Sequence, residues 1–128
     1  MNILVACGGD SPEREVSLRS GEAVAGALIQ AGHLVVLEDV PSSLGTVEAF
    51  RRVGADLVFV ALHGGWGEDG RLQAVLEAHQ IPYTGSGPES CMVSMDKEVT
   101  RALFLQRGLP VPSGRVLERA EATVEALE

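Results

Sequence analysis

Two short apolar runs, each followed by a glycine-rich loop, constrain the fold of this chain more than any other feature. Residues 2–7 (NILVAC) precede Gly8 and Gly9, and residues 56–62 (DLVFVAL) precede a loop at 63–70 that holds four glycines. Runs this short and this apolar are typical of strands buried inside a parallel sheet. The glycines allow the chain to leave such a strand in a sharp turn.

Helical periodicity separates the apolar runs. Apolar side chains recur at helical spacing over residues 16–31, and Gly32 stands where that helix would end. Similar patterns predict a second strand at 33–38 and helices at 44–52 and 70–79. This alternation predicts an α/β fold, a three-layer Rossmann-like domain with a parallel sheet and helices on both faces.

The pattern changes after residue 80. Residues 81–83 (IPY) predict a short fourth strand, and residues 85–88 (GSGP) predict a turn. One helical stripe then ends before Gly108; its apolar members, of which we expect the two methionines to be core residues, are Met92, Met95, Val99, Ala102 and Leu103. Residues 115–128 predict one weak strand and one helix.

Length and charge limit the classes of function. The chain has 128 residues, enough for one domain and the beginning of another. Its net charge of -8 argues against a surface that binds nucleic acid, because such surfaces concentrate Lys and Arg.

Cysteine usage and hydropathy indicate the compartment. Cys7 and Cys91 have no CxxC spacing and no partner histidine, so we expect two reduced thiols and neither a disulfide nor a zinc site. No apolar run approaches the roughly 18 residues that a membrane span needs, and no basic signal-peptide region follows Met1. We therefore expect a cytoplasmic protein that does not bind a membrane.

The first glycine-rich loop carries two glutamates in front of a helix. In one interpretation Glu13 and Glu15 are capping groups, because carboxylates are favoured at the positive end of the helix dipole. In the other, one carboxylate faces the cleft at the strand end and binds a substrate ammonium by a charge-assisted hydrogen bond. Two residues that are two positions apart cannot both face inward on a helix, so the two glutamates can divide these roles.

The second glycine-rich loop begins with His63, at the end of the third expected strand. Ligand sites in parallel sheets lie beyond the carboxyl ends of the strands. The amides of the loop glycines can approach an anion, and His63 can donate to a carboxylate or carry a proton. We favour this functional role for His63, whereas we expect Glu68 and Asp69 to cap the next helix. His33 and His79 have no such setting and are expected to be structural.

The first strand–helix junction and the region of Lys97 each lack a familiar nucleotide-binding motif. No GxGxxG motif stands at the first strand–helix junction, and no GxxxxGK[ST] motif can be written near Lys97. Lys97 is the single lysine of the chain. Its default interpretation is a solvated side chain, and the alternative is a phosphate ligand that acts as a mobile point charge.

Four segments together carry a resemblance to a known family. In chain order they are GGDSPEREVSLRSG at 8–21, ALHGGWGEDGRLQ at 61–73, IPYTGSG at 81–87 and SMDKEVTR at 94–101. They resemble the N-terminal motifs of D-alanine:D-alanine ligases, which are ATP-grasp enzymes. Each string alone is weak evidence, but four in the same order and with compatible spacing are specific.

The resemblance implies a reaction and its cofactors. In this family ATP phosphorylates the carboxylate of a first D-alanine, and the amine of a second D-alanine attacks the acylphosphate to give the dipeptide for peptidoglycan precursor synthesis. Magnesium assists ATP binding and phosphoryl transfer. The resemblance thus implies ATP and Mg²⁺ as cofactors, with most of their ligands outside these 128 residues and no metal ligand within them.

The resemblance also implies roles for individual residues. Glu13 matches the glutamate that holds the ammonium of the first D-alanine, and His63 matches the histidine beside the same pocket. We assign Ser17 and Gly64 to that substrate-binding site as well, with Ser17 mainly organising the loop and the start of the helix. Lys97 matches the lysine that reaches the ATP phosphates.

The resemblance further implies a domain organisation. Residues 1–94 correspond to the N-terminal pre-ATP-grasp substrate domain, and residues 95–128 correspond to the beginning of the ATP-grasp central domain. We expect this stretch alone to be inactive in ligation, because most catalytic groups of the family lie further along the chain. The family also implies a homodimer formed through N-terminal domains.

Two alternatives remain open from the sequence. The first is a related ligase that joins D-alanine to D-lactate or D-serine, because the group that selects the second substrate would lie outside these residues. The second is a stand-alone interaction module with no chemistry of its own.

Overall fold

A three-stranded parallel sheet forms the centre of the structure. The computed structural model describes residues 1–114. The strands are β1 (Asn2–Gly8), β2 (Leu34–Val40) and β3 (Leu57–Val60), and their order is β2-β1-β3. The central strand β1 pairs with Leu34–Val40 along its whole length, and with β3 from Ile3 to Ala6. These three strands confirm the apolar runs and the parallel sheet that the sequence predicts.

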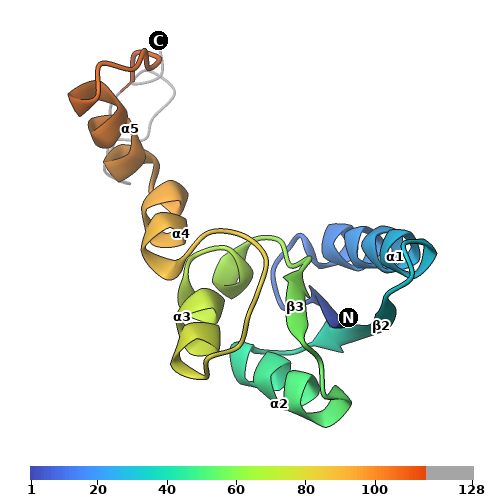
Figure 1. The fold of residues 1–128 in the computed structure, drawn as a ribbon. Coiled ribbons are helices and arrows are strands. Elements are labelled where there is room, and N and C mark those ends of the chain that lie inside the picture. Colours follow the sequence, from blue (N-terminus) through green and yellow to red (C-terminus); the bar gives the residue numbers. More distant parts are fainter. Residues whose placement is uncertain (115–128) are drawn as a thin grey trace. The chain divides into compact units, whose positions relative to one another are not determined.

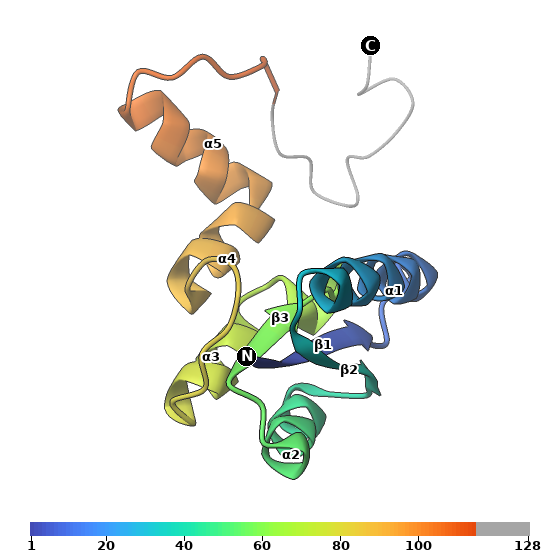
Figure 2. The same ribbon diagram turned by 45° about the vertical axis from the view of Figure 1, so that its right-hand side comes forward.

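Helices cover both faces of this sheet. They are α1 (Arg14–Gln30) on one face, and α2 (Ser43–Val53) and α3 (Arg71–Ala78) on the other (Figures 1 and 2). Alternate side chains of β1 point to opposite faces, as the two-residue period of a strand requires. Leu4 and Ala6 pack with α2 and α3, whereas Val5 and Cys7 pack with α1. The predicted three-layer α/β fold is confirmed.

The contact between α1 and β1 is unusually close at one position. A Cβ atom at Gly21 would lie 2.7 Å from Cys7 Cβ and 3.0 Å from Leu37 Cδ1. Glycine therefore lets the helix backbone approach the strand at the point where β1 ends. This approach brings the first turns of α1 next to the loops that follow the strands.

The expected fourth strand is wrong. Only an isolated bridge joins Tyr83 to Val58. Val58 N donates to Pro82 O at 2.9 Å, and Thr84 N donates to Val58 O at 3.0 Å. Because proline has no N–H to donate, the segment does not extend a regular ladder along β3.

The single helix expected after residue 90 is also wrong, because the structure has two helices there, α4 (Pro88–Met95) and α5 (Lys97–Gln106). Asp96 between them is extended, and its carboxylate accepts hydrogen bonds from Glu98 N and Val99 N. Asp96 is thus an N-cap, which begins a new helix.

The two methionines expected in the core are exposed. The exposed fraction is 64% for Met92 and 48% for Met95.

The chain divides into two compact units, Met1–Met95 and Asp96–Glu128. The first contains the sheet, the helices α1 to α4 and a short 3₁₀ helix η1 (Gly65–Gly67). Within the described residues, the second contains α5 and the segment after it. The strand and helix expected at 115–128 lie outside the described residues. In the part that the structure describes, no helix is long and apolar enough to cross a membrane.

The close approach at Gly21 predicts opposite effects for two substitutions in α1. Gly21→Ala should lower the free energy of unfolding by about 1–3 kcal/mol, because its methyl group overlaps Cys7. Gly26→Ala should raise it by about 0.5–1 kcal/mol, because a Cβ there meets nothing within 4 Å and alanine favours the helix. Urea unfolding followed by circular dichroism measures both. Equal stability of the two variants would contradict the packing described here.

Candidate functional site

The loops that follow β1 and β3 meet beyond the carboxyl ends of these strands. Ser11 lies in the first loop, and its hydroxyl donates to His63 O in the second loop at 2.6 Å. The same hydroxyl oxygen accepts a hydrogen bond from Glu13 N at 3.1 Å. One serine therefore fixes the backbone of both loops at the edge where parallel sheets carry their ligand sites.

Ser17 fixes α1 to the same edge. Its side chain is fully buried, its oxygen accepts from Gly8 N at 2.9 Å, and its hydroxyl donates to Ala61 O at 2.7 Å. The residue thus joins α1 to the end of β1 and to the first residue after β3. This geometry suits the organising role expected for Ser17, since both hydrogen bonds are made within the protein.

Glu13 reaches from the start of α1 to the second loop. It occupies the N-cap position, but its side chain makes no capping hydrogen bond. A Cβ atom at Gly64 would lie 2.9 Å from Glu13 Oε2, and Gly64 has a positive φ of 66°. Glu13 therefore stands at the helix start without a capping hydrogen bond, whereas Glu15 lies in the first turn of the helix, where a carboxylate is favoured.

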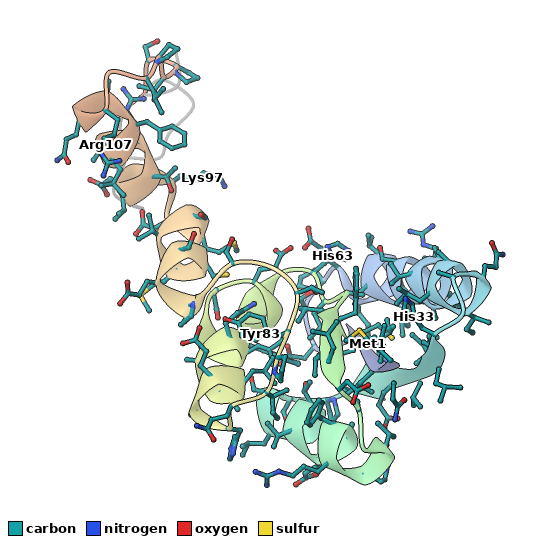
Figure 3. All side chains as sticks on the ribbon, viewed as in Figure 1. Met1, His33, His63, Tyr83, Lys97 and Arg107 are labelled. Atoms are coloured by element: carbon teal, nitrogen blue, oxygen red, sulfur yellow. The ribbon has the colours of Figure 1, made fainter. Side chains whose placement is uncertain are left out.

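The side chain of His63, the first residue of the second loop, lies beside α1. Its Nε2 atom is 3.1 Å from Ser20 Oγ, and its Nδ1 atom is 3.6 Å from Glu68 Oε1 (Figure 3 labels His63). The other carboxylate oxygen of Glu68 accepts from Gly64 N at 2.9 Å. Groups on two different elements thus restrain the imidazole ring.

The expectation that Glu68 caps α3 is wrong, because its carboxylate faces back into the loop toward Gly64 and His63. Asp69 does support the helix start, since its Oδ1 atom accepts from Arg71 N at 3.1 Å. The hydrogen bond from the Arg71 side chain also lowers the pKa of Asp69. The hydrogen bond from the backbone amide of Gly64 holds the Glu68 carboxylate at the site.

An exposed ion pair braces the first loop from the side of β2. Arg14 donates to Gly9 O at 3.0 Å and to both carboxylate oxygens of Asp39. Its guanidinium lowers the pKa of Asp39, chiefly through this hydrogen bond. Any stability from the lowered pKa is present above the ordinary aspartate value and is lost as the pH falls through the lowered one. Because both side chains are about half exposed, we expect this contribution to be small.

A pocket of about 450 Å³ opens beside His63 and Glu68. Its other lining residues come from the end of β3, from η1 and α3, and from the segment through α4: Val60, Leu62, Gly67, Gln73, Thr84, Gly85, Ser86, Ser90, Cys91, Ser94 and Met95. Among the described residues, no lysine or arginine lines it. Burial raises the pKa of the Cys91 thiol, so this residue contributes a neutral group. The pocket is thus rich in hydroxyl groups and in hydrogen-bond acceptors.

Gln73 lines this pocket and is hydrogen-bonded to η1. Its Nε2 atom donates to Gly67 O at 2.9 Å, and its Oε1 atom is buried without a hydrogen-bond partner among the described residues. The carbonyl oxygen of Gly67 only accepts hydrogen bonds, so the side-chain NH₂ group of Gln73 must face it. This sets the orientation of the Gln73 amide. Gln73 thereby holds the loop that carries Glu68.

The expected ATP contact belongs to the second unit, and the described residues hold no cluster of metal-ligating side chains. Lys97 is the first residue of α5 in the second unit, and its side chain is exposed (Figure 3 labels it). Within residues 1–114 no group of three or more His, Cys, Asp or Glu side chains could hold a metal ion.

Sequence reasoning missed three contributions to this site. Ser11 and Ser20 contact His63 from 52 and 43 residues away in the sequence, whereas Glu68 binds the amide of Gly64 within the same loop. The available signal for Ser20 is its spacing of three residues from Ser17, which puts both hydroxyls on one face of α1. No local pattern distinguishes Glu68 from a helix-capping residue.

Comparisons with known proteins agree on one family. The model of the D-Ala D-Ala ligase N-terminus matches residues 41–86. The D-alanine:D-alanine ligase of Anaeromyxobacter dehalogenans (strain 2CP-C) is 51% identical over 120 residues, which are 94% of this chain and 38% of that protein. The ligase of Pelotomaculum thermopropionicum is 44% identical over 128 residues, or 40% of its length. The chain thus spans about two fifths of these relatives.

Solved structures show the same likeness. The D-alanine:D-alanine ligase of Bacillus anthracis complexed with ATP superposes with a TM-score of 0.80 at 32% identity, over 88% of this chain and 38% of that one. The ligase of Coxiella burnetii gives a TM-score of 0.75 at 28% identity, over 97% of this chain and 47% of that one. The resemblance found in the four sequence segments is confirmed.

The buried hydroxyl of Ser17 generates a prediction for the site. Ser17→Ala should lower the free energy of unfolding by about 1–3 kcal/mol, because Gly8 N–H and Ala61 O lose their partner inside the protein. Ser43→Ala, a serine-to-alanine change in the first turn of α2, should stay within about 0.5 kcal/mol of the parent. Chemical denaturation checks the pair. If the free energy of unfolding of Ser17→Ala equals that of Ser43→Ala, the two buried hydrogen bonds of Ser17 do not stabilise the fold as described.

Proposed function

From its likeness in sequence and fold to the N-terminal part of D-alanine:D-alanine ligases, we propose that this chain binds the first D-alanine of such a ligase. The whole protein would join two D-alanine molecules at the expense of ATP and supply a dipeptide for peptidoglycan precursors. The observation that carries this proposal is the meeting of Glu13, Gly64 and His63 beyond the ends of β1 and β3. Two loops from distant parts of the sequence form one edge there.

Glu13 is the group that we propose for the substrate ammonium. Its side chain is exposed, makes no capping hydrogen bond, and forms no ion pair with another described residue. A carboxylate in this state can bind an ammonium by charge-assisted hydrogen bonds, which are shorter and stronger than neutral ones. Gly64 leaves room for this, because a Cβ at that position would press on the carboxylate.

His63 is the group that we propose beside the substrate carboxylate. It lines the pocket described above, and its ring is held from two sides by Ser20 and Glu68. A fixed imidazole can donate a hydrogen bond to a carboxylate without first losing rotational freedom. Ser17 and Gly64 complete the site in supporting roles, through the strand ends and the loop backbone.

The remaining parts of the proposal concern the whole protein. ATP supplies the phosphoryl group that activates the carboxylate of the first D-alanine, and Lys97 is proposed to contact its phosphates. Residues 1–94 are proposed as the substrate domain and residues 95–128 as the start of the ATP-grasp central domain. Magnesium as the ion that accompanies ATP, a homodimer through the N-terminal domains and a cytoplasmic location belong to the same proposal.

Removing the charge of Glu13 tests the proposed function. Glu13→Gln should weaken the binding of D-alanine to this chain by roughly ten- to a hundredfold, the range for loss of a hydrogen bond between charged groups. The matched control is Glu15→Gln on the same helix turn, which should leave the dissociation constant within about twofold of the parent because exposed surface charges contribute little. Isothermal titration calorimetry at millimolar D-alanine measures all three proteins. Unchanged affinity in Glu13→Gln would reject the ammonium role.

A further inference from the structure

We infer that Ser20 is a positioning residue, which together with Glu68 holds neutral His63 with its proton on Nδ1. The importance of Ser20 for ligand binding rests on the proposed function, whereas the tautomer of His63 does not. The inference concerns three side chains from two parts of the chain, α1 and the loop after β3.

The two neighbours of the imidazole ring differ in their hydrogen-bonding capacity. A carboxylate only accepts hydrogen bonds, whereas a hydroxyl can either donate or accept. Glu68 Oε1 lies 3.6 Å from Nδ1, and Ser20 Oγ lies 3.1 Å from Nε2. An N–H at Nδ1 is therefore attracted to the carboxylate, whereas a lone pair at the same position would be repelled by it.

The assignment at Nδ1 determines the assignment at Nε2. A neutral imidazole carries one proton, so its second nitrogen must accept. Ser20 is the neighbour that can donate to it. The distance of 3.1 Å between Ser20 Oγ and Nε2 then describes a hydrogen bond from the serine hydroxyl to the histidine ring.

Both neighbours are themselves held in place. Ser20 lies one turn after Ser17, whose two buried hydrogen bonds anchor α1 to the ends of β1 and β3. Glu68 is fixed by the hydrogen bond from Gly64 N to its Oε2 atom. The tautomer is thus set by two groups that are themselves held in place by hydrogen bonds within the protein.

This arrangement specifies which atom of His63 acts on a ligand. Glu68 and His63 line the pocket, whereas Ser20 does not. Because the 3.6 Å between Nδ1 and Glu68 Oε1 is longer than a hydrogen bond, the N–H at Nδ1 remains able to donate, and it is the donor proposed for a ligand carboxylate. The hydrogen bond from the Ser20 hydroxyl keeps Nε2 occupied, so that the ring does not rotate to offer the lone pair of Nε2 to a ligand.

The test is the nitrogen NMR spectrum of His63 in this chain, under mildly alkaline conditions where histidine is normally neutral. In the parent, Nδ1 should give a protonated, pyrrole-type signal and Nε2 an unprotonated, pyridine-type signal. In Ser20→Ala, the two signals should move toward each other as the other tautomer becomes populated. Ser20→Thr keeps the hydroxyl and should restore the parent spectrum.

Two further variants exclude a general structural effect. Glu68→Met removes the carboxylate that faces Nδ1 and should shift the tautomer in the same direction as Ser20→Ala. Ser43→Ala, on the opposite face of the sheet, should leave the spectrum unchanged. A parent protein with its proton on Nε2, or an unaltered His63 spectrum in Ser20→Ala, would overturn the inference.

Ligand binding provides the second readout. The dissociation constant for D-alanine should rise by roughly two- to tenfold in Ser20→Ala, as expected when one neutral hydrogen bond is lost, and should recover in Ser20→Thr. If the spectra behave as expected but the parent protein does not bind D-alanine, the proposed function fails and the positioning role of Ser20 stands. If D-alanine binds and the spectra do not respond to Ser20→Ala, the positioning role fails alone.

Discussion

The arrangement of the site depends on one buried hydroxyl group. Ser17 on α1 accepts a hydrogen bond from the last residue of β1 and donates one to the first residue after β3. Buried backbone groups need such partners, so the same two bonds that satisfy the strand ends also fix the helix to them. The close packing of Gly21 on Cys7 secures the next turn. Glu13 and Ser20 are carried by this helix and inherit its position.

The charged side chains at this edge of the sheet favour one kind of ligand over another. Glu13 and Glu68 bring two carboxylates to the second loop, and none of the described residues that line the adjacent pocket is a lysine or an arginine. Such a surface favours a ligand with an amine, whereas an anion without an amine would meet repulsion. We propose His63, held between Ser20 and Glu68, as the donor for a carboxylate. An amino acid carries both groups, which agrees with the likeness to D-alanine:D-alanine ligases.

The sequence predicts the elements that follow from apolar periodicity and misses the details set by single proline or polar residues in the folded chain. The buried strands and the two glycine-rich loops follow from short apolar runs, and the sheet brings the loops together. The strand expected at Tyr83 fails because Pro82 has no N–H, and the expected long helix fails because Asp96 caps a second one. Glu68 was expected to cap α3, yet it binds the amide of Gly64. That choice depends on the folded loop, which a local sequence pattern does not contain.

The central claim is that the loops after β1 and β3 form one binding site for D-alanine. Its most direct test is a two-dimensional NMR titration of this chain with D-alanine, with every backbone amide assigned. We expect the shifts to concentrate at Glu13, Gly64 and His63, and the amides of α2 on the far face of the sheet to remain unchanged. Shifts spread over α2, or no shifts at millimolar D-alanine, would contradict the account.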